Sequence, residues 1–235
     1  MSDHTGRIVL VTGASRGIGY AAAKHLAASG AHVIAIARTQ GGLEDLDDDI
    51  KAAGGQCTLV PMDLKDGDSI DRLGKALHER FGKLDGLLLN AGQLGSITPL
   101  PHTKPDEWDS VISVNLTANY RLIRSLDPLL RASDAGRVVA VTSSVAQSHR
   151  AYWGAYAVSK AGLEAMANIY AAETEITKVR VNIYDPGGTR TAMRAKAVPG
   201  EDPSQLPNPA DHWPNLSKLL SADFTDTGSL LKFSG

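Results

Sequence analysis

The stretch Thr12-Gly13-Ala14-Ser15-Arg16-Gly17-Ile18-Gly19 lies between a continuous apolar run at residues 8–11 and a segment of helical periodicity at residues 18–29. Glycines at such spacing let the backbone turn tightly, approach a pyrophosphate closely and pack a helix against the strand. The first turn of that helix offers free N–H groups and the positive end of the helix dipole to phosphates. Because a strand precedes the glycines and a helix follows them, the stretch predicts a dinucleotide-binding site.

Short apolar runs alternate with helical segments along the rest of the chain. The strand candidates are residues 8–11, 33–37, 59–60, 87–89, 138–141 and 179–183. Helical periodicity marks residues 18–29, 107–131 and 155–175, and two further segments with the apolar faces Leu43, Leu46 and Ile50, and Ile70, Leu73 and Leu77. Parallel strands need a crossover connection, so this order predicts an α/β fold, with a doubly wound parallel sheet flanked by helices. No repeat or linker divides the chain, and we expect residues 1–235 to form a single domain.

The composition argues against several classes of protein. The 235 residues hold 24 basic and 26 acidic side chains, so no overall field attracts nucleic acid or an anionic membrane. No apolar run approaches the roughly 18 residues of a membrane span, and residues 1–4 have no signal-peptide character. Cys57 is the single cysteine, and none of the seven histidines has metal-ligand spacing. We therefore expect a cytoplasmic protein with no disulfide, no metal, no nucleic-acid partner and no membrane partner.

A set of short motifs follows the glycine stretch in a fixed order. They are Asp63, Leu89-Asn90-Ala91-Gly92, Asn115, Ser143-Ser144, Tyr156-x-x-x-Lys160, Pro186-Gly187 and Thr191. Together with TGxxxGxG at residues 12–19, this ordered set resembles the short-chain dehydrogenase/reductase family over roughly residues 7–233. The resemblance implies an oxidoreductase with a Rossmann-type fold of about seven strands. Residues 229–233 are the candidate for the seventh strand.

Tyr156 and Lys160 lie four residues apart, which places both side chains on one face of a helix. By resemblance, Tyr156 is the general acid and base, Lys160 lowers its pKa and holds the nicotinamide ribose, and Asn115 anchors a water that connects Lys160 to solvent. A tyrosine pKa of about 10 must fall by roughly three units, or about 4 kcal/mol, for proton transfer near pH 7. An ammonium group about 4 Å away supplies about that much. Tyr20 and Lys24 share the spacing but follow the glycine turn, so we expect them to be structural.

A serine hydroxyl is expected to bind the substrate oxygen, and two adjacent serines are candidates. The family's usual interval of thirteen residues to the tyrosine selects Ser143, whereas its Ser-Ser-x-Ala pattern selects Ser144. We favour Ser143 because the chemistry requires the hydroxyl to reach the region of Tyr156.

The residues at the end of the second strand predict which nicotinamide cofactor is used. An NAD enzyme of this fold has an acidic residue about 20 residues past the glycines, where it accepts from the ribose 2′-OH. This chain has Ala37 and Arg38 there, and Arg16 lies within the glycine turn. A guanidinium binds phosphate oxygens with a rigid fork of donors, so both arginines predict NADP(H) rather than NAD.

The resemblance implies that further residues border the cofactor. They are Gly13, Ser15, Gly17, Ile18, Gly19, Asp63, Leu64, Asn90, Ala91, Gly92, Tyr156, Lys160, Pro186, Gly187, Thr189 and Thr191. Among them, the backbone at Thr189 is expected to contact the nicotinamide carboxamide.

These assignments predict an NADP(H)-dependent oxidoreductase that transfers a hydride between nicotinamide and a small carbonyl or secondary alcohol substrate. Its catalytic residues would be Asn115, Ser143, Tyr156 and Lys160. Two alternatives stay open, a 3-oxoacyl thioester reductase of the same family and a catalytically idle NADPH-binding sensor or scaffold. A protein that only binds needs no proton relay, so the presence of all four residues speaks against idleness. The resemblance also implies a homodimer or a homotetramer.

The substrate side of the site is less specified by the sequence. Five of the eleven prolines fall within residues 199–214, which argues against a regular helix there. We expect residues 195–214 to form a proline-rich substrate flap within the domain. Three aromatic residues are candidates to line the substrate pocket or to pack in a subunit contact, namely Tyr152, Trp153 and Trp213. Three basic residues near its expected mouth either attract an acidic substrate, steer the cofactor phosphate or are simply solvated, namely Arg190, Arg194 and Lys196.

Overall fold

The chain folds around one parallel β-sheet, which the computed structural model describes over residues 3–234. Its seven strands lie in the order β3-β2-β1-β4-β5-β6-β7, and each neighbouring pair is parallel. The strands are β1 (Ile8–Thr12), β2 (His32–Ala37), β3 (Gln56–Pro61), β4 (Gly86–Leu89), β5 (Arg137–Val141), β6 (Arg180–Asp185) and β7 (Leu230–Lys232). The predicted Rossmann-type, doubly wound sheet is confirmed, including its seventh strand.

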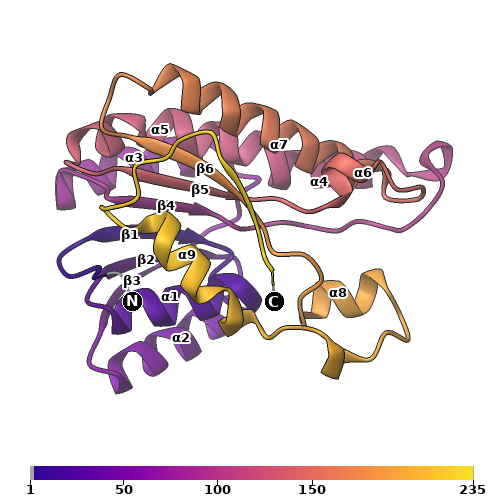
Figure 1. Ribbon diagram of the computed structural model, residues 1–235, viewed down its shortest axis with the longest axis horizontal. Helices are drawn as coiled ribbons and strands as arrows, with labels where there is room; N and C mark the ends of the chain where they lie inside the picture. Colours follow the sequence, from indigo (N-terminus) through magenta and orange to yellow (C-terminus); the bar gives the residue numbers. More distant parts are fainter. Residues whose placement is uncertain (1–2, 235) are drawn as a thin grey trace.

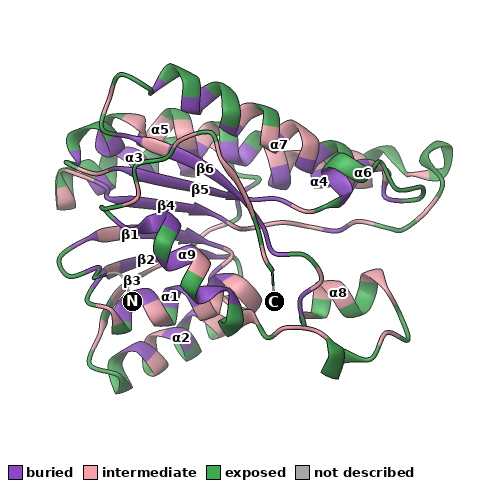
Figure 2. Cartoon of the chain, viewed as in Figure 1, coloured by how far each residue is buried: buried purple, intermediate pink, exposed green. Residues whose placement is uncertain are grey.

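Helices cover both faces of the sheet (Figure 1). The α-helices are α1 (Gly17–Ala28), α2 (Gln40–Ala52), α3 (Gly67–Phe81), α4 (Pro105–Ile112), α5 (Ala118–Ala132), α6 (Val145–Ser148), α7 (Gly154–Glu173), α8 (Ala192–Ala197) and α9 (Trp213–Leu220). Helices α3, α5 and α7 pack on one face, and α1, α2 and α9 pack on the other. These six helices turn their buried residues to the strands and their exposed residues to solvent (Figure 2).

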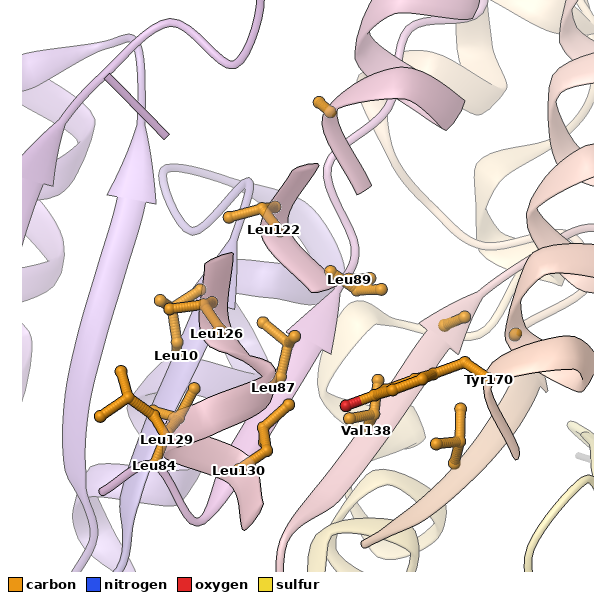
Figure 3. Packing of buried hydrophobic residues seen from close by; sticks show 14 of the residues in the cluster. Leu10, Leu84, Leu87, Leu89, Leu122, Leu126, Leu129, Leu130, Val138 and Tyr170 are labelled. Carbon is orange, nitrogen blue, oxygen red and sulfur yellow. The ribbon is translucent and has the colours of Figure 1, made fainter. Parts of the chain in front are cut away.

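The two faces of the sheet are built by alternate residues of the same strands. In β1, Leu10 packs into the cluster beneath α3, α5 and α7, whereas Val9 and Val11 pack into the cluster beneath α1, α2 and α9. Successive strand side chains point to opposite faces, so a strand covered on both sides must be apolar throughout. Leu87, Leu126 and their neighbours fill the first of these clusters (Figure 3). The continuous apolar runs in the sequence have this physical cause.

The strand order places a crevice at the carboxyl ends of β1 and β4. The chain runs from β1 outward to β3, crosses back to β4, and then runs outward in the other direction to β7. The loops that follow β1 and β4 therefore leave the sheet on opposite faces. In α/β sheets, ligands bind in the crevice between two such loops. This crevice is where the fold positions a site.

Two segments differ from the sequence prediction. Residues 107–131, expected as one helical stretch, form α4 and α5 joined by a π-helical turn, η2 (Ser113–Thr117). The proline-rich segment holds the 3₁₀ turns η3 (Pro203–Gln205) and η4 (Pro209–His212), but α9 begins at Trp213. Pro214 lies in the first turn of α9, where a missing N–H breaks no hydrogen bond. The expectation that residues 199–214 exclude regular helix was therefore wrong at its C-terminal end.

Within residues 3–234, none of the helices combines the length and apolar character needed to cross a membrane.

Candidate active site

The glycine turn is held against the end of β4 by a small set of hydrogen bonds. Thr12 Oγ1 accepts from the backbone N–H groups of Asn90 and Ala91, at 3.0 Å each. Asn90 Nδ2 donates to the Thr12 carbonyl oxygen at 2.9 Å. A Cβ atom at Gly19 would lie 2.4 Å from the carbonyl oxygen of Gly13 and 2.5 Å from Asn90 Nδ2, so only glycine fits. The close packing fixes the first turn of α1 beside the crevice.

A cleft of about 940 Å³ opens at this edge of the sheet, at the upper end of the usual range for cofactor and substrate sites. Every residue predicted to bind the cofactor lines it except Gly19, which lies behind the turn. Its wall also contains residues for which the sequence offered no motif, among them Gln93, Leu94, Glu107, Val114 and Met193. They come from loops and helix ends far apart in the sequence, so only the fold brings them together.

One end of the cleft is basic. Arg16 and Arg38 are exposed and line this end, and neither forms an ion pair with an acidic side chain within residues 3–234. Asp63 also lines the cleft and accepts at 3.0 Å from the backbone N–H of Lys65, which fixes its carboxylate. Two uncompensated guanidinium groups beside a glycine turn suit a ligand that carries phosphates.

The other end of the cleft gathers three residues of the predicted catalytic set. Tyr156 and Lys160 are buried on α7, and Ser143 follows β5 in the cleft wall. Lys160 Nζ donates to the Val141 carbonyl oxygen at 2.7 Å. Val141, the last residue of β5, and Thr142 after it thus bind two residues one helical turn apart on α7, Lys160 and Glu164.

The two buried titratable groups differ from expectation in one respect. Burial raises the pKa of Tyr156 to about 12; a hydrogen bond with Ser143 lowers it, and the Asp185 carboxylate raises it. We expected Lys160 to lower this pKa, but its Nζ atom binds the Val141 oxygen and lies 5.8 Å from the centroid of the Tyr156 ring. Tyr156 is therefore a protonated phenol at neutral pH, which is the form that a proton donor requires.

Lys160 retains a positive charge at neutral pH despite its burial. Burial lowers its pKa to about 8, and the carboxylate of Glu164, one turn further along α7, acts in the opposite direction. The ammonium is thus present beside the phenol when a proton leaves it.

Asn115 is completely buried in the π-helical turn and is not part of the cleft wall. Its Oδ1 accepts from Gln93 N at 2.7 Å, and its Nδ2 donates to Gln93 O and Ser159 Oγ at 2.9 Å each. Its own carbonyl oxygen accepts from Asn119 Nδ2 at 2.7 Å. In the structure Asn115 orients the loop after β4, and its predicted contact with a water stays a prediction.

Comparison with known proteins decides the family. The sequence profile described as short chain dehydrogenase matches residues 7–202. The chain belongs to this family. It is 41% identical over 220 residues to the Escherichia coli K12 protein named "Uncharacterized oxidoreductase YciK", covering 92% of this chain and 87% of that one.

Two further relatives of this short-chain dehydrogenase carry information on ligands. The Salmonella typhimurium LT2 protein named "3-oxoacyl-[acyl-carrier-protein] reductase FabG" is 35% identical over 188 residues, 80% of this chain and 75% of that one. A crystal structure of a short chain dehydrogenase from Escherichia coli CFT073, complexed with NADPH, superposes with a TM-score of 0.91 at 40% identity. It covers 97% of this chain and 96% of that chain. The chain is thus an oxidoreductase of the short-chain dehydrogenase family.

Tyr20 and Lys24 of this short-chain dehydrogenase lie outside the cleft wall. Both side chains donate to Asp49 Oδ2 on α2, at 2.8 and 2.9 Å, and so join two helices on the far side of the glycine turn. The expectation that this second Tyr-x-x-x-Lys pair is structural agrees with these contacts.

The aromatic candidates for the substrate side separate in the structure. Trp153 lines the cleft and packs with Leu94 beside Tyr156. Tyr152 is exposed and lies outside the cleft wall. Trp213 is buried between His4 and His25 in the core, because α9 begins there and needs an apolar contact with α1. The expectation that Trp213 lines the pocket was wrong.

The three basic residues after the Pro-Gly turn all line the cleft but are not equivalent. Arg194 is partly buried and forms a two-pronged ion pair with Glu201, at 2.6 Å for each contact. Arg190 donates to Asn208 Oδ1, and Lys196 is exposed. Arg194 therefore has a structural partner, whereas Lys196 is solvated.

Proposed function

We propose that this protein is an NADP(H)-dependent oxidoreductase that reduces a carbonyl group or oxidises the corresponding secondary alcohol. The observation that carries the proposal is the difference between the two ends of one continuous cleft. Arg16 and Arg38 line one end, and Ser143, Tyr156 and Lys160 meet at the other. A dinucleotide with an extra phosphate at one end and a redox-active ring at the other matches this arrangement.

The residues present fit such a cofactor. The glycine turn leaves no room for a Cβ atom at Gly19, and Gly13 and Gly17 adopt the positive φ values of 69° and 61° that side chains disfavour. The two free guanidinium groups would hold the 2′-phosphate, and the first turn of α1 would face the pyrophosphate. When bound, the nicotinamide would supply or accept a hydride at its C4 atom.

The protein's own residues would handle the oxygen and the proton. Ser143 would donate a hydrogen bond to the carbonyl oxygen and orient it beside Tyr156. Tyr156, protonated at neutral pH, would deliver its proton as the alkoxide develops. The ammonium of Lys160, held in place by the Val141 carbonyl, would stabilise the phenolate that remains. In the oxidative direction the same groups act in reverse.

The substrate end of the cleft is apolar with a basic rim. Leu94, Val145 and Trp153 pack around Tyr156, and Met193 packs against them from α8. We infer that residues 195–214 close over this chamber as the substrate flap. A 3-oxoacyl thioester is the second candidate substrate, because Arg190 and Lys196 at the rim would favour an acidic carrier and a relative bears that activity in its name.

We also infer a homodimer or a homotetramer. Tyr120 on α5, and Val158 and Ile169 on α7, are large apolar side chains that stay about half exposed, at 54%, 48% and 59%. These helices would pack against a second copy of the chain.

The test of the proposed function is consumption of NADPH and NADH across ketones, aldehydes, sugars and 3-oxoacyl thioesters. We expect turnover of at least one class, with NADPH preferred.

Arg38→Asp should reduce kcat/KM for NADPH about 100-fold and favour NADH, because it exchanges a phosphate-binding cation for an acceptor of a ribose hydroxyl. Arg72→Asp, the same change on an exposed face of α3, should leave the preference unchanged. Equal efficiency with both cofactors would exclude the NADP(H) assignment, and binding without turnover of any carbonyl would favour the sensor.

A pair of substitutions decides between the adjacent serines. Ser143 lines the cleft and lowers the pKa of Tyr156, whereas Ser144 is exposed and lies outside the cleft wall. We expect Ser143→Ala to lower kcat about 100-fold, since it removes a donor to the developing oxyanion, and Ser144→Ala to lower it less than threefold. Steady-state kinetics on the substrate found above measures both. The reverse ranking would assign the role to Ser144.

A further inference from the structure

A buried histidine outside the cleft connects α9 to the cleft wall. His212 ends η4 and is completely buried. Its Nδ1 atom lies 2.7 Å from the hydroxyl of Tyr184 on β6, and its Nε2 atom lies 2.9 Å from Thr189 Oγ1. The ring also packs against Phe233 at 4.5 Å between centroids. Both nitrogens and one face of the imidazole are thus engaged.

The hydrogen bonds around His212 form a chain with one direction. Burial lowers the pKa of His212 to about 4, so the ring is neutral at pH 7 and has one donor and one acceptor. The Thr189 hydroxyl donates to the Pro186 carbonyl oxygen at 3.4 Å, so its Oγ1 atom accepts from His212 Nε2–H. His212 Nδ1 is then the acceptor, and the Tyr184 hydroxyl donates to it.

Thr189 lies where this chain meets the cleft. Its side chain is buried and faces His212, while the residue lines the cleft within the turn at residues 186–191. The next residue, Arg190, uses its backbone N–H to bind Pro207 O at 2.9 Å. Among residues 3–234, no acceptor is found for the backbone N–H of Thr189. A buried, unpaired N–H in the wall of a ligand cleft is suited to bind a carbonyl oxygen of the ligand.

We propose that His212 is a positioning residue, which holds the Thr189 side chain and thereby aims the Thr189 N–H at the nicotinamide end of the bound cofactor. The proposal rests on the NADP(H) function proposed above. The hydrogen bonds on both sides of the His212 ring fix the orientation of the turn at residues 186–191 relative to β6 and η4. Loss of the contact to Thr189 lets the turn rotate, and the nicotinamide loses a fixed donor. The phosphates and the adenine, at the Arg38 end of the cleft, are unaffected.

Two substitutions at His212 separate its two contacts. His212→Asn keeps a polar atom near the Nδ1 position, within reach of Tyr184, but none near Thr189. His212→Gln keeps a donor near the Nε2 position, within reach of Thr189. Thr189→Val removes the hydroxyl from the other side without changing the shape of the side chain. Each variant leaves a buried polar group unpaired, so all three lose some stability, and binding rather than stability is the informative quantity.

The measurement compares two probes by calorimetry: NADPH, and adenosine 2′,5′-bisphosphate, which lacks the nicotinamide. We expect His212→Asn and Thr189→Val each to weaken NADPH binding about tenfold, the size of one hydrogen bond, and to leave the bisphosphate within twofold. His212→Gln should bind NADPH within threefold of the wild type. The double variant Thr189→Val with His212→Asn should be no weaker than either single variant, because both remove the same contact.

His4→Asn is the matched control. His4 is also completely buried, has a pKa lowered by burial to about 4, and binds Ser217 Oγ of α9 at 3.0 Å, away from the cleft. This variant should lose stability but bind both probes normally. Equal weakening of both probes by His212→Asn, or no weakening of either, would overturn the positioning role. If His212→Asn does not fold, Thr189→Val provides the same test, by comparing its loss of NADPH affinity with its loss of bisphosphate affinity. A wild-type protein that binds the bisphosphate but not NADPH would overturn the proposed function itself.

Discussion

Tyr156→Phe is expected to lower kcat/KM for carbonyl reduction about a thousandfold, within the range that general acids contribute. The phenol is protonated at neutral pH, and the proposed mechanism transfers its proton to the substrate oxygen as charge develops there. Burial raises its pKa to about 12, so the proton is held until that charge appears. Phenylalanine keeps the packing with Leu94 and Trp153. NADPH binding should therefore stay within about threefold of the wild type.

Tyr120→Phe is the control for this substitution. Tyr120 lies on α5 with 54% of its surface exposed and is absent from the cleft wall, so its hydroxyl has no route to the substrate. The comparison uses kcat/KM for the substrate and a separate titration of NADPH. A Tyr156→Phe protein with more than a tenth of the wild-type kcat/KM would mean that another group delivers the proton.

The features that the sequence predicted well are local or depend on simple periodicity. The turn at residues 12–19 needs glycine at fixed positions because a Cβ atom at Gly19 would overlap the backbone of the same turn. The buried strands need apolar residues on both faces, so their runs are continuous. Tyr156 and Lys160 could be distinguished from Tyr20 and Lys24 only by their place after the fifth strand, which the element order supplied.

The features that were missed depend on contacts between distant parts of the chain. The π-helical turn at Ser113–Thr117 adds a residue to the helix where Asn115 turns inward to bind Gln93, 22 residues away. Trp213 was expected in the pocket, but it packs against two histidines from the N-terminal part of the chain. His212 meets Thr189 across 23 residues with no shared motif. Aromatic and histidine side chains suit pockets and cores alike, so composition alone could not place them.

The pKa of Tyr156 shows a further limit of sequence reasoning. A charge pair considered alone predicts a lowered pKa, but the net direction depends on how much water the phenol loses. Desolvation is the largest effect at Tyr156, and it follows from the closure of the cleft wall by residues that carry no motif.

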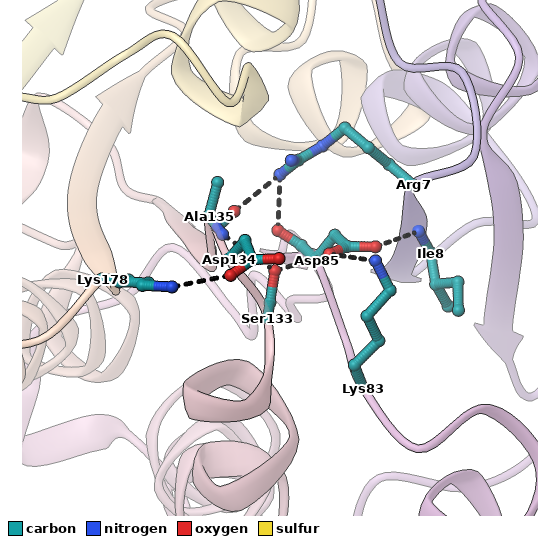
Figure 4. Close-up of polar contacts among 8 residues, drawn as sticks. All are labelled: Arg7, Ile8, Lys83, Asp85, Ser133, Asp134, Ala135 and Lys178. Carbon is teal, nitrogen blue, oxygen red and sulfur yellow. Dashed lines mark hydrogen bonds and ion pairs between the residues drawn. The ribbon is translucent and has the colours of Figure 1, made fainter.

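Asp85→Ala is expected to destabilise the fold by about 3 kcal/mol, the largest stability effect that we predict. The Asp85 carboxylate precedes β4 and is only 4% exposed. It accepts from Ile8 N at 2.9 Å, Ser133 Oγ at 2.5 Å and Lys83 Nζ at 3.2 Å (Figure 4). One carboxylate thus joins the start of β1, the start of β4 and the loop after α5. Alanine would leave the buried Ser133 hydroxyl and the partly buried Ile8 N–H without their acceptor.

Asp134→Ala provides the comparison within the same cluster. Asp134 pairs with Lys178 at 2.6 Å, a shorter contact than that of Asp85 with Lys83, but its side chain is 97% exposed (Figure 4). A solvated pair of this kind contributes between about 0 and 1 kcal/mol. Thermal unfolding should therefore show a decrease in Tm of about 9 °C for Asp85→Ala and at most about 3 °C for Asp134→Ala. Equal decreases would mean that the length of an ion pair, rather than burial of its acceptor, sets stability at this end of the sheet. Because the cleft lies at the opposite end of β4, folded Asp85→Ala protein should still bind NADPH.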